Sequence, residues 1–231
     1  MKLLDLFERL SFAELSNLAI GMEGAGTIRD EDQRKVLIHT NDGLLQLYSR
    51  FILKTKYLLI EEQEHITQYH LIEKFTESQN CVEYPYIKDK VADRFTGDLI
   101  RILEVYDDCG NQFALNDTED CHSLFTPSPQ TLQIPNPRTG RPKHILYQAR
   151  HDIILEILEN TWVEVPFVLE GALQAYIAHK IFSHMNGQEN LLKSQDHYAT
   201  YERICQEVEA KDLVSTSVSN SSNKLTERGF P

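Results

Sequence analysis

The sequence PFVLEGALQAYIAHKIFSHMNGQENLLKSQDHYATYERICQEVEAK, residues 166–211, decides how this chain folds. Pro166 stands where the first turn of a helix tolerates proline. Apolar residues then recur at three- and four-residue spacing as far as residue 185. A tight stop at Asn186-Gly187 follows, and a matching apolar stripe runs over residues 190–211. The stretch therefore predicts two helices that pack together as a hairpin.

The residues after this hairpin, 214–231, form a polar tail rich in serine and threonine. Such a composition cannot form a core and is typical of a disordered segment. The tail has a net charge of +1, whereas residues 1–213 hold the remaining −13. We therefore expect an extended arm that reaches onto an acidic surface of a neighbour. Its candidate partner-binding residues are Val214, Val218, Lys224, Leu225, Arg228 and Phe230.

The first third of the chain predicts two further helices. Residues 12–20 have the pattern of a short amphipathic helix, and a glycine-rich connector follows at residues 21–26. Asp30 begins a capping box, and one apolar face then runs to about residue 53. Gly43 interrupts this face at a cost of about 1 kcal/mol. We expect the helix to continue through it.

The middle of the chain changes to the pattern of β-strands. We expect residues 57–61 to pair with residues 66–75 across an acidic turn. Two further hairpins join residues 99–106 with 112–115, and residues 131–134 with 145–149. A short helix at residues 91–96 completes the prediction together with residues 153–158, which we expect to form a last strand or, alternatively, a helical turn.

These elements predict an α+β fold. Its body is an antiparallel helical bundle made by the N- and C-terminal helices, residues 1–55 and 160–213. Residues 56–159 form a β-rich middle insertion, and residues 214–231 form the extended C-terminal arm.

Composition excludes several classes of function. The chain of 231 residues has a net charge of −12. It is therefore poorly suited to bind nucleic acid through phosphates or to bind an anionic membrane surface. It has no apolar run long enough to span a bilayer, and its start does not have the pattern of a signal peptide. We expect its four scattered cysteines to be reduced thiols.

No group of residues in the sequence predicts catalysis, a cofactor or a metal site. The glycine cluster at residues 21–26 lacks the lysine and the preceding strand of a phosphate-binding loop. Glu61, Glu64 and His65 are the residues of an alternative hypothesis, a metal-dependent hydrolase. Successive strand residues point to opposite faces, so this run cannot converge on an ion by itself. A solvated acidic turn is the preferred interpretation.

A basic loop stands out within this acidic chain. Residues 135–144 carry Arg138, Arg141 and Lys143 with no acidic residue, and three prolines stiffen them. A stiff loop loses less entropy when it docks. We therefore expect the loop to contact another protein or, less favourably, DNA. A soluble regulatory binding module that uses this loop is a second alternative hypothesis.

Five segments of the chain resemble the head-to-tail adaptors of tailed bacteriophages. They are LAIGMEGAGTI at residues 18–28, NDGLLQLYSRF at 41–51, VPFVLEGAL at 165–173, YIAHKIF at 176–182 and GQEN at 187–190. The resemblance covers most of the chain but includes no signature motif. It implies a structural virion protein of the phage neck, assembled in the host cytoplasm.

The resemblance also implies partners. The expected assembly is a homo-oligomeric ring of twelve copies, docked on the portal protein by the C-terminal arm and joined on its other side to a tail or nozzle protein. DNA would pass through the lumen without specific binding. Twelve copies would carry roughly −144 formal charges, which repel one another. Contacts between neighbours must therefore be apolar or hydrogen-bonded.

Overall fold

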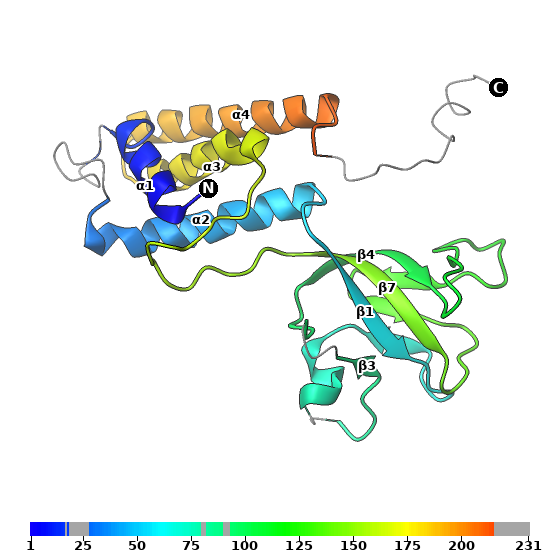
Figure 1. Cartoon of the computed structure of the whole chain (residues 1–231). Coiled ribbons are helices and arrows are strands. Elements are labelled where there is room, and N and C mark those ends of the chain that lie inside the picture. The colour runs from blue at the N-terminus through cyan, green and yellow to red at the C-terminus, as the bar shows by residue number, and fades with distance from the viewer. Residues whose placement is uncertain (17, 19–27, 80–81, 90–92, 215–231) are drawn as a thin grey trace, which may run out of the picture. The chain divides into compact units, whose positions relative to one another are not determined.

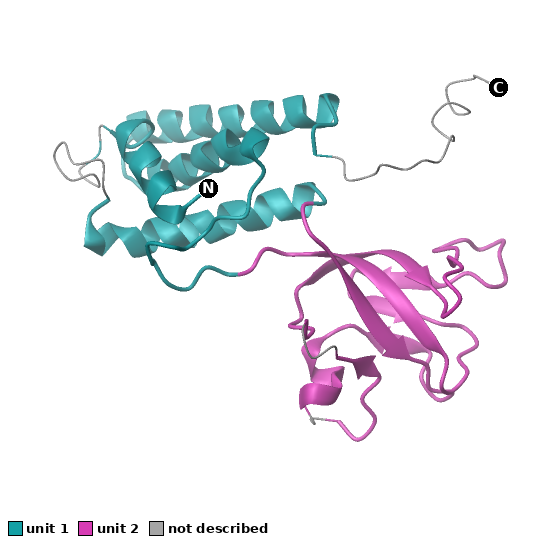
Figure 2. Cartoon of the chain, viewed as in Figure 1, with its two compact units in different colours: residues 1–52, 153–231 teal, residues 53–152 magenta. Residues whose placement is uncertain are grey.

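The computed structural model describes residues 1–16, 18, 28–79, 82–89 and 93–214. The chain divides into two compact units, shown in different colours in Figure 2. One unit combines Met1–Ile52 with Ile153–Pro231, and the other is Leu53–Asp152. The chain therefore passes between the units twice, once in each direction.

The first unit is helical, and its longest helices come from both ends of the chain (Figure 1). Its central helix contacts each of the other three. That helix buries alanine, leucine, tyrosine, isoleucine and phenylalanine side chains on most of its circumference, as expected of a core helix. The α-helices of this unit are α1 (Leu3–Phe12), α2 (Asp30–Arg50), the central α3 (Glu170–Ser183) and α4 (Gln188–Ala210).

The predicted continuity of α2 through Gly43 is confirmed, and the structure gives the reason for the glycine. Gly43 is buried where α2 meets α3. A β-carbon added there would lie 2.7 Å from Cδ1 of Leu173 and 3.1 Å from Cδ1 of Tyr176. Real β-carbons essentially never approach another atom as closely as 2.7 Å. The absence of a side chain at Gly43 therefore lets α2 and α3 pack closely.

The predicted helical hairpin is also confirmed. Gly187 has φ +112 and stands immediately before α4, a backbone conformation that favours glycine. The short 3₁₀ turn Phe167–Leu169 leads from Pro166 into α3. Ser194 on α4 is buried and donates a hydrogen bond to the carbonyl of His179 on α3, at 3.1 Å. A polar contact thus fixes the register of the two helices.

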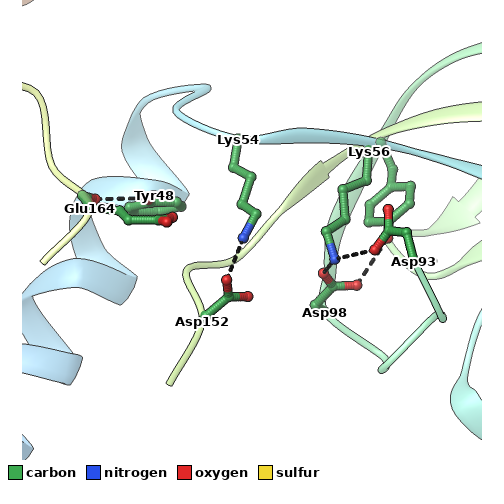
Figure 3. A network of polar contacts seen from close by, with 8 residues as sticks. Tyr48, Lys54, Lys56, Asp93, Asp98, Asp152 and Glu164 are labelled. Atoms are coloured by element: carbon green, nitrogen blue, oxygen red, sulfur yellow. Dashed lines mark hydrogen bonds and ion pairs between the residues drawn. The ribbon is translucent and has the colours of Figure 1, made fainter. Parts of the chain in front are cut away.

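A long extended segment, residues 153–167, leads back into the helical unit, and we call it the return segment. It lies against the start of the chain, where Leu3 N donates to the Thr161 carbonyl at 2.9 Å. Tyr48 on α2 donates its hydroxyl to the Glu164 carbonyl at 2.7 Å (Figure 3). The strand predicted at residues 153–158 is wrong, since Ile154 bonds to the side chain of Asn41 and not to a neighbouring strand.

The second unit consists of two antiparallel sheets. The larger has the order β3-β1-β7-β4 and the smaller the order β2-β6-β5. Neighbouring strands are mostly distant in sequence. The strands of the larger sheet are β1 (Thr55–Glu61), β3 (Ile87–Lys88), β4 (Leu99–Tyr106) and β7 (Pro142–Ala149). Those of the smaller sheet are β2 (Gln68–His70), β5 (Phe125–Ser128) and β6 (Thr131–Gln133), and two 3₁₀ turns follow β2 at Glu73–Phe75 and Glu77–Gln79.

The predicted strand pairs are largely wrong, although most of the predicted strands exist. β1 pairs with β7 and β3, and β2 pairs with β6, so residues 57–61 and 66–75 are not partners. β6 and β7 belong to different sheets and do not form a hairpin. β4 has the predicted bounds, and the predicted hairpin with residues 112–115 is present only at its turn, where Tyr106 bridges Gln112 and Phe113 N donates to the Val105 carbonyl at 2.9 Å. The main partner of β4 is β7. Hydrophobic pattern identifies a strand and does not identify its distant partner.

The core of the second unit is apolar with aromatic contacts. Tyr69 and Tyr86 pack edge to face at 5.1 Å between ring centroids, and Phe75 stacks on Tyr86 at 4.8 Å. The hydroxyl of Tyr147 donates to the buried carboxylate of Asp98 at 2.9 Å. Lys56 pairs with that same carboxylate at 3.0 Å (Figure 3). The hydrogen bond satisfies the Tyr147 hydroxyl and one oxygen of Asp98, and the ion pair compensates the charge of the buried carboxylate.

The two ends of the second unit are joined by an ion pair. Lys54 lies just before β1 and Asp152 just after β7, and Lys54 Nζ is 2.8 Å from Asp152 Oδ2 (Figure 3). The amide of Ala149 also donates to the carbonyl of Lys54 at 2.9 Å. The points at which the chain enters and leaves this unit are therefore adjacent.

The structure is α+β, but it contradicts the predicted arrangement of the helices. They are not an antiparallel bundle of N- and C-terminal helices that flanks one β-rich middle. The helices instead gather around α3, and α1 runs obliquely to the other three in Figure 1. The β residues form two separate antiparallel sheets. The predicted C-terminal arm lies outside the described residues from position 215 onward.

Two local predictions at the front of the chain are also corrected. The first helix is α1, whose buried face is formed by Leu3, Leu6, Phe7 and Leu10, and it ends at Phe12. In the described part of the predicted helix at residues 12–20, residues 13–16 form turns. The whole of the predicted glycine connector, residues 21–26, lies outside the described residues. The side chain of Asp30 makes no capping bond to the backbone at the start of α2. The predicted helix at residues 91–96 is absent from its described part, residues 93–96.

Candidate functional site

The basic loop predicted from the sequence connects β6 of one sheet to β7 of the other. It is held by backbone hydrogen bonds to the residues that follow β1. Glu62 N donates to the Arg141 carbonyl at 2.9 Å, and Gly140 N donates to the Glu62 carbonyl at 3.1 Å. Gly140 has φ +81, which allows the tight turn at this place. The loop is thus fixed by the sheet unit on which it lies.

A buried ion pair fixes the base of the loop. Glu62 and Lys143 are 3% and 5% exposed, and their charged atoms lie 2.6 Å apart. The other carboxylate oxygen of Glu62 accepts a hydrogen bond from Arg138 N, also at 2.6 Å. The ammonium of Lys143 lies 5.0 Å from the ring centroid of Phe113. One glutamate therefore holds both the lysine and the backbone of the loop.

The loop forms one wall of a cavity of about 660 Å³. The residues after β1 and the segment around residues 121–124 form other parts of its lining. Both arginines of the loop contribute to the lining, and both are exposed. The lining thus combines charged groups with the apolar side chains of Phe113, Leu124 and Ile134.

The three predicted cations of the loop have different environments. Lys143 is buried in its ion pair with Glu62, so its charge is already compensated. Within the described residues, the guanidinium groups of Arg138 and Arg141 have no hydrogen-bond or ion-pair partner. Only these two cations of the loop are therefore presented to a partner. Sequence reasoning missed the glutamate because it lies across the sheet and not within the loop.

The alternative metal ligands do not converge. Glu61 pairs with Lys88 at 2.9 Å, and the His65 ring packs edge-on against Tyr84 at 5.9 Å. Glu64 lines the cavity. Among the described residues, these three side chains do not bring their ligand atoms together. The structure therefore provides no support for the site that the hydrolase hypothesis requires.

A separate group of possible ligand atoms lies in the turn after β4. Asp107, Asp108 and Cys109 approach one another there. The Asp107 carboxylate accepts hydrogen bonds from the backbone of Asn111 at 2.7 Å and of Cys109 at 2.9 Å. Bonds from the Asn111 side chain and backbone lower the pKa of Asp107. These bonds explain why an aspartate stands at residue 107, since its carboxylate holds the backbone of the turn.

The helical unit has its own polar cluster between α2, α3 and α4. Arg50 donates two hydrogen bonds to Glu209, at 2.6 and 3.1 Å, and one to Glu202 at 2.9 Å. The rings of Tyr176 and Tyr201 pack at 5.3 Å beside these groups. The cluster lines a hollow of about 420 Å³. Because the charges of Arg50, Glu202 and Glu209 are paired with one another, we infer that this cluster holds the helices together.

The most unusual surface of the helical unit is the return segment. Large apolar side chains are exposed along it, and Leu155 and Phe167 are 81% and 82% exposed. Pattern analysis missed this because it treated the first part of the segment as a strand. The exposed apolar residues of the return segment are Ile153, Leu155, Leu158, Trp162 and Phe167.

The predicted docking residues of the C-terminal arm are almost entirely outside the described residues. Val214 is the last described residue and is partly exposed. The others lie beyond it, and the structure gives no position for them. They are Val218, Lys224, Leu225, Arg228 and Phe230.

No family model matches the chain. No curated protein matches it significantly. None of the helices in the described residues combines the length and apolar character that a bilayer crossing requires.

Proposed function

We propose that this chain is a structural subunit of a phage neck, a head-to-tail connector that joins the portal to the tail. The observation that carries the proposal is the exposed apolar surface of the return segment. Single exposed apolar residues are ordinary, but several large ones along one segment are typical of an interface. A subunit covered by its neighbours on assembly accounts for them.

The charge of the chain favours this type of contact. Copies that each carry a net charge of −12 repel one another at long range. Apolar burial contributes about 25 cal/mol per Å² and does not depend on charge. A ring of such subunits is therefore best held by apolar residues at each junction. Heterologous contacts of this kind close into a ring when the rotation between neighbours fits.

The proposal assigns further roles by resemblance. Residues 214–231 dock on the portal protein, and the opposite side of the ring receives a tail or nozzle protein. DNA passes through the lumen without being gripped, in agreement with the acidic composition. The ring has twelve copies.

The test is assembly on the portal protein of the same phage. The purified chain and the portal are mixed and viewed by electron microscopy, and we expect an added ring beneath the portal. In the variant Leu155→Ser/Phe167→Ser the ring should be lost while the thermal unfolding transition stays unchanged. Both side chains are mostly exposed, so the monomer should tolerate the changes.

Tyr57→Ser is the matched control, since Tyr57 is 58% exposed but lies on β1 in the other unit. This variant should assemble normally. A folded wild-type chain that never adds to the portal contradicts the proposal. So does a ring that forms equally well with and without the two apolar side chains.

A further inference from the structure

The cavity beside the basic loop has the properties of a binding site. Its wall is fixed before any partner arrives, because Glu62 bonds to both Lys143 and the backbone of Arg138. Thr139 adds another restraint, since its hydroxyl accepts a hydrogen bond from Glu64 N at 3.2 Å. A wall that is already ordered loses little entropy on binding.

Two charges in this cavity are uncompensated. Within the described residues, neither Arg138 nor Arg141 has a side-chain partner. Several other arginines of the described chain have one: Arg9 donates to Glu170 at 2.7 Å, and Arg50 and Arg101 also bond to side chains. Guanidinium groups match the geometry of carboxylate and phosphate oxygens. The free pair therefore indicates an anionic ligand.

The charge of the lining decides between the two kinds of anion. Three cations, Arg138, Arg141 and Lys143, line the cavity with two carboxylates, Glu62 and Glu64. The formal excess is a single positive charge. One carboxylate balances it, whereas a phosphate dianion would leave the lining with a net negative charge. The lining therefore favours a monoanion.

The apolar part of the lining distinguishes a peptide from a free ion. Leu124 and Ile134 are almost fully buried and leave little surface to a ligand, but Phe113 is only partly buried, and its ring centroid lies 5.0 Å from the Lys143 ammonium. The accessible part of this ring can pack against the methylene groups of a glutamate side chain. The volume of about 660 Å³ is in the range of ligand sites and exceeds what one carboxylate fills.

We propose that this cavity binds an acidic peptide segment of a partner protein and holds one carboxylate between Arg138 and Arg141. The site is made by residues of the sheet unit, whereas the return segment belongs to the helical unit. Its failure would therefore leave the proposed ring assembly standing, and the reverse also holds.

The test measures binding of a fluorescent peptide to the full chain by anisotropy. The probe has glutamates spaced by glycine and serine, and its partner probe has glutamine at each of those places. We expect the glutamate peptide to bind at least tenfold more tightly. Added NaCl should weaken this binding, because salt screens charges at an exposed site.

Variants and competitors make the assignment specific. Arg138→Gln and Arg141→Gln should each weaken binding at least tenfold, and the double variant should abolish it. Arg34→Gln is the matched control, since Arg34 is an exposed arginine on α2. It should bind as the wild type does. Inorganic phosphate and a single-stranded DNA oligonucleotide should compete weakly.

Several results would overturn the proposal. Equal binding of the glutamate and glutamine peptides, or binding of neither, excludes recognition of a carboxylate. Retained binding by the double variant excludes the two arginines as its cause. Stronger competition by phosphate or DNA than by free glutamate peptide assigns the site to a different anion. Thermal unfolding of each variant shows that it is folded.

Discussion

The Nζ atom of Lys143 lies 2.6 Å from Oε1 of Glu62, and both side chains are almost completely buried. In the sequence Lys143 belongs to a basic loop that is expected to face outward. The structure shows that one of the three loop cations supports the loop from beneath. Such a pair fixes geometry, although its net contribution to stability depends on desolvation. Glu62 also bonds to the backbone of both arginines, since its carboxylate accepts from Arg138 N and its amide donates to the Arg141 carbonyl.

Breaking this pair should destabilise the sheet unit strongly. Glu62→Gln leaves a buried ammonium without a counter-charge and should lower the free energy of unfolding by about 3 kcal/mol. Lys143→Met should have a similar effect by leaving the carboxylate of Glu62 unpaired. The double variant should recover much of the loss. Urea unfolding followed by far-ultraviolet circular dichroism measures all four proteins.

The double-mutant cycle gives the decisive number for this pair. A coupling energy well above 1 kcal/mol is expected for a buried, hydrogen-bonded ion pair. A coupling near zero, with single variants as stable as the wild type, would show that the pair does not hold the loop. The chain has one tryptophan, Trp162, in the helical unit. The fluorescence of Trp162 therefore reports on the helical unit, which does not contain the Glu62–Lys143 pair, and serves as an internal control.

Gly43 should not tolerate alanine, although alanine is the better helix former. The propensity gain is about 1 kcal/mol, but the new methyl group would lie 2.7 Å from Leu173 Cδ1 in a closely packed contact. Overpacking costs about 1–3 kcal/mol. We therefore expect Gly43→Ala to lower the free energy of unfolding, measured in urea.

Gly171→Ala provides the matched control for Gly43→Ala. Gly171 also lies within a helix, but a β-carbon there meets only Ile204 Cδ1, at an ordinary 3.5 Å. This change should be neutral or stabilise the protein by up to about 1 kcal/mol. If both alanines stabilise the protein equally, the close approach of α2 and α3 at Gly43 does not constrain that position.

The helices that sequence reasoning placed well are those whose signals are local. The α3–α4 hairpin has its proline, its glycine stop and its apolar stripes within 46 consecutive positions. The periodicity of α2 is likewise strong enough to extend across Gly43. The first helix was misplaced because residues 12–20 carry a similar pattern to Leu3–Phe12. Nothing in a local pattern decides which of the two is buried.

The parts that could not be predicted depend on contacts between distant residues. β1 and β7 pair over their full length, although some 80 residues separate them in the chain. Glu62 finds Lys143 through this same pairing. Sequence analysis identified Arg138, Arg141 and Lys143 as candidates but had no means of separating the buried cation from the two free ones. The cavity is equally a product of pairing between distant strands.

Lowering the pH should destabilise the protein through His151. Burial, and then the nearby charges of Arg150 and Lys54, lower the pKa of this histidine from 6.5 to about 4, while Asp152 acts in the opposite direction. Between these values the unfolded chain binds a proton that the folded chain does not. Stability is therefore lost as the pH falls from 6.5 toward 4. Each pKa unit is worth about 1.4 kcal/mol.

The variant His151→Gln isolates this effect. The free energy of unfolding, measured in urea, should fall between pH 7 and pH 5 in the wild type. In the variant this fall should be smaller by a free energy on the order of 2 kcal/mol. His122→Gln is the control, because His122 is exposed. It should keep the wild-type pH dependence. An unchanged pH dependence in His151→Gln would show that another group titrates in this range.

Arg50 should not be replaceable by lysine, because its guanidinium bonds two glutamates of α4 at once. It donates to both carboxylate oxygens of Glu209 and to Glu202, and a lysine ammonium cannot reproduce this planar arrangement. Since Glu209 is nearly half exposed, we expect Arg50→Lys to cost only about 1 kcal/mol, with a smaller cost in high salt. Urea unfolding followed by Trp162 fluorescence measures it. Arg203→Lys, an exposed change on α4, should have no effect, and equal losses in both variants would refute the role given to Arg50.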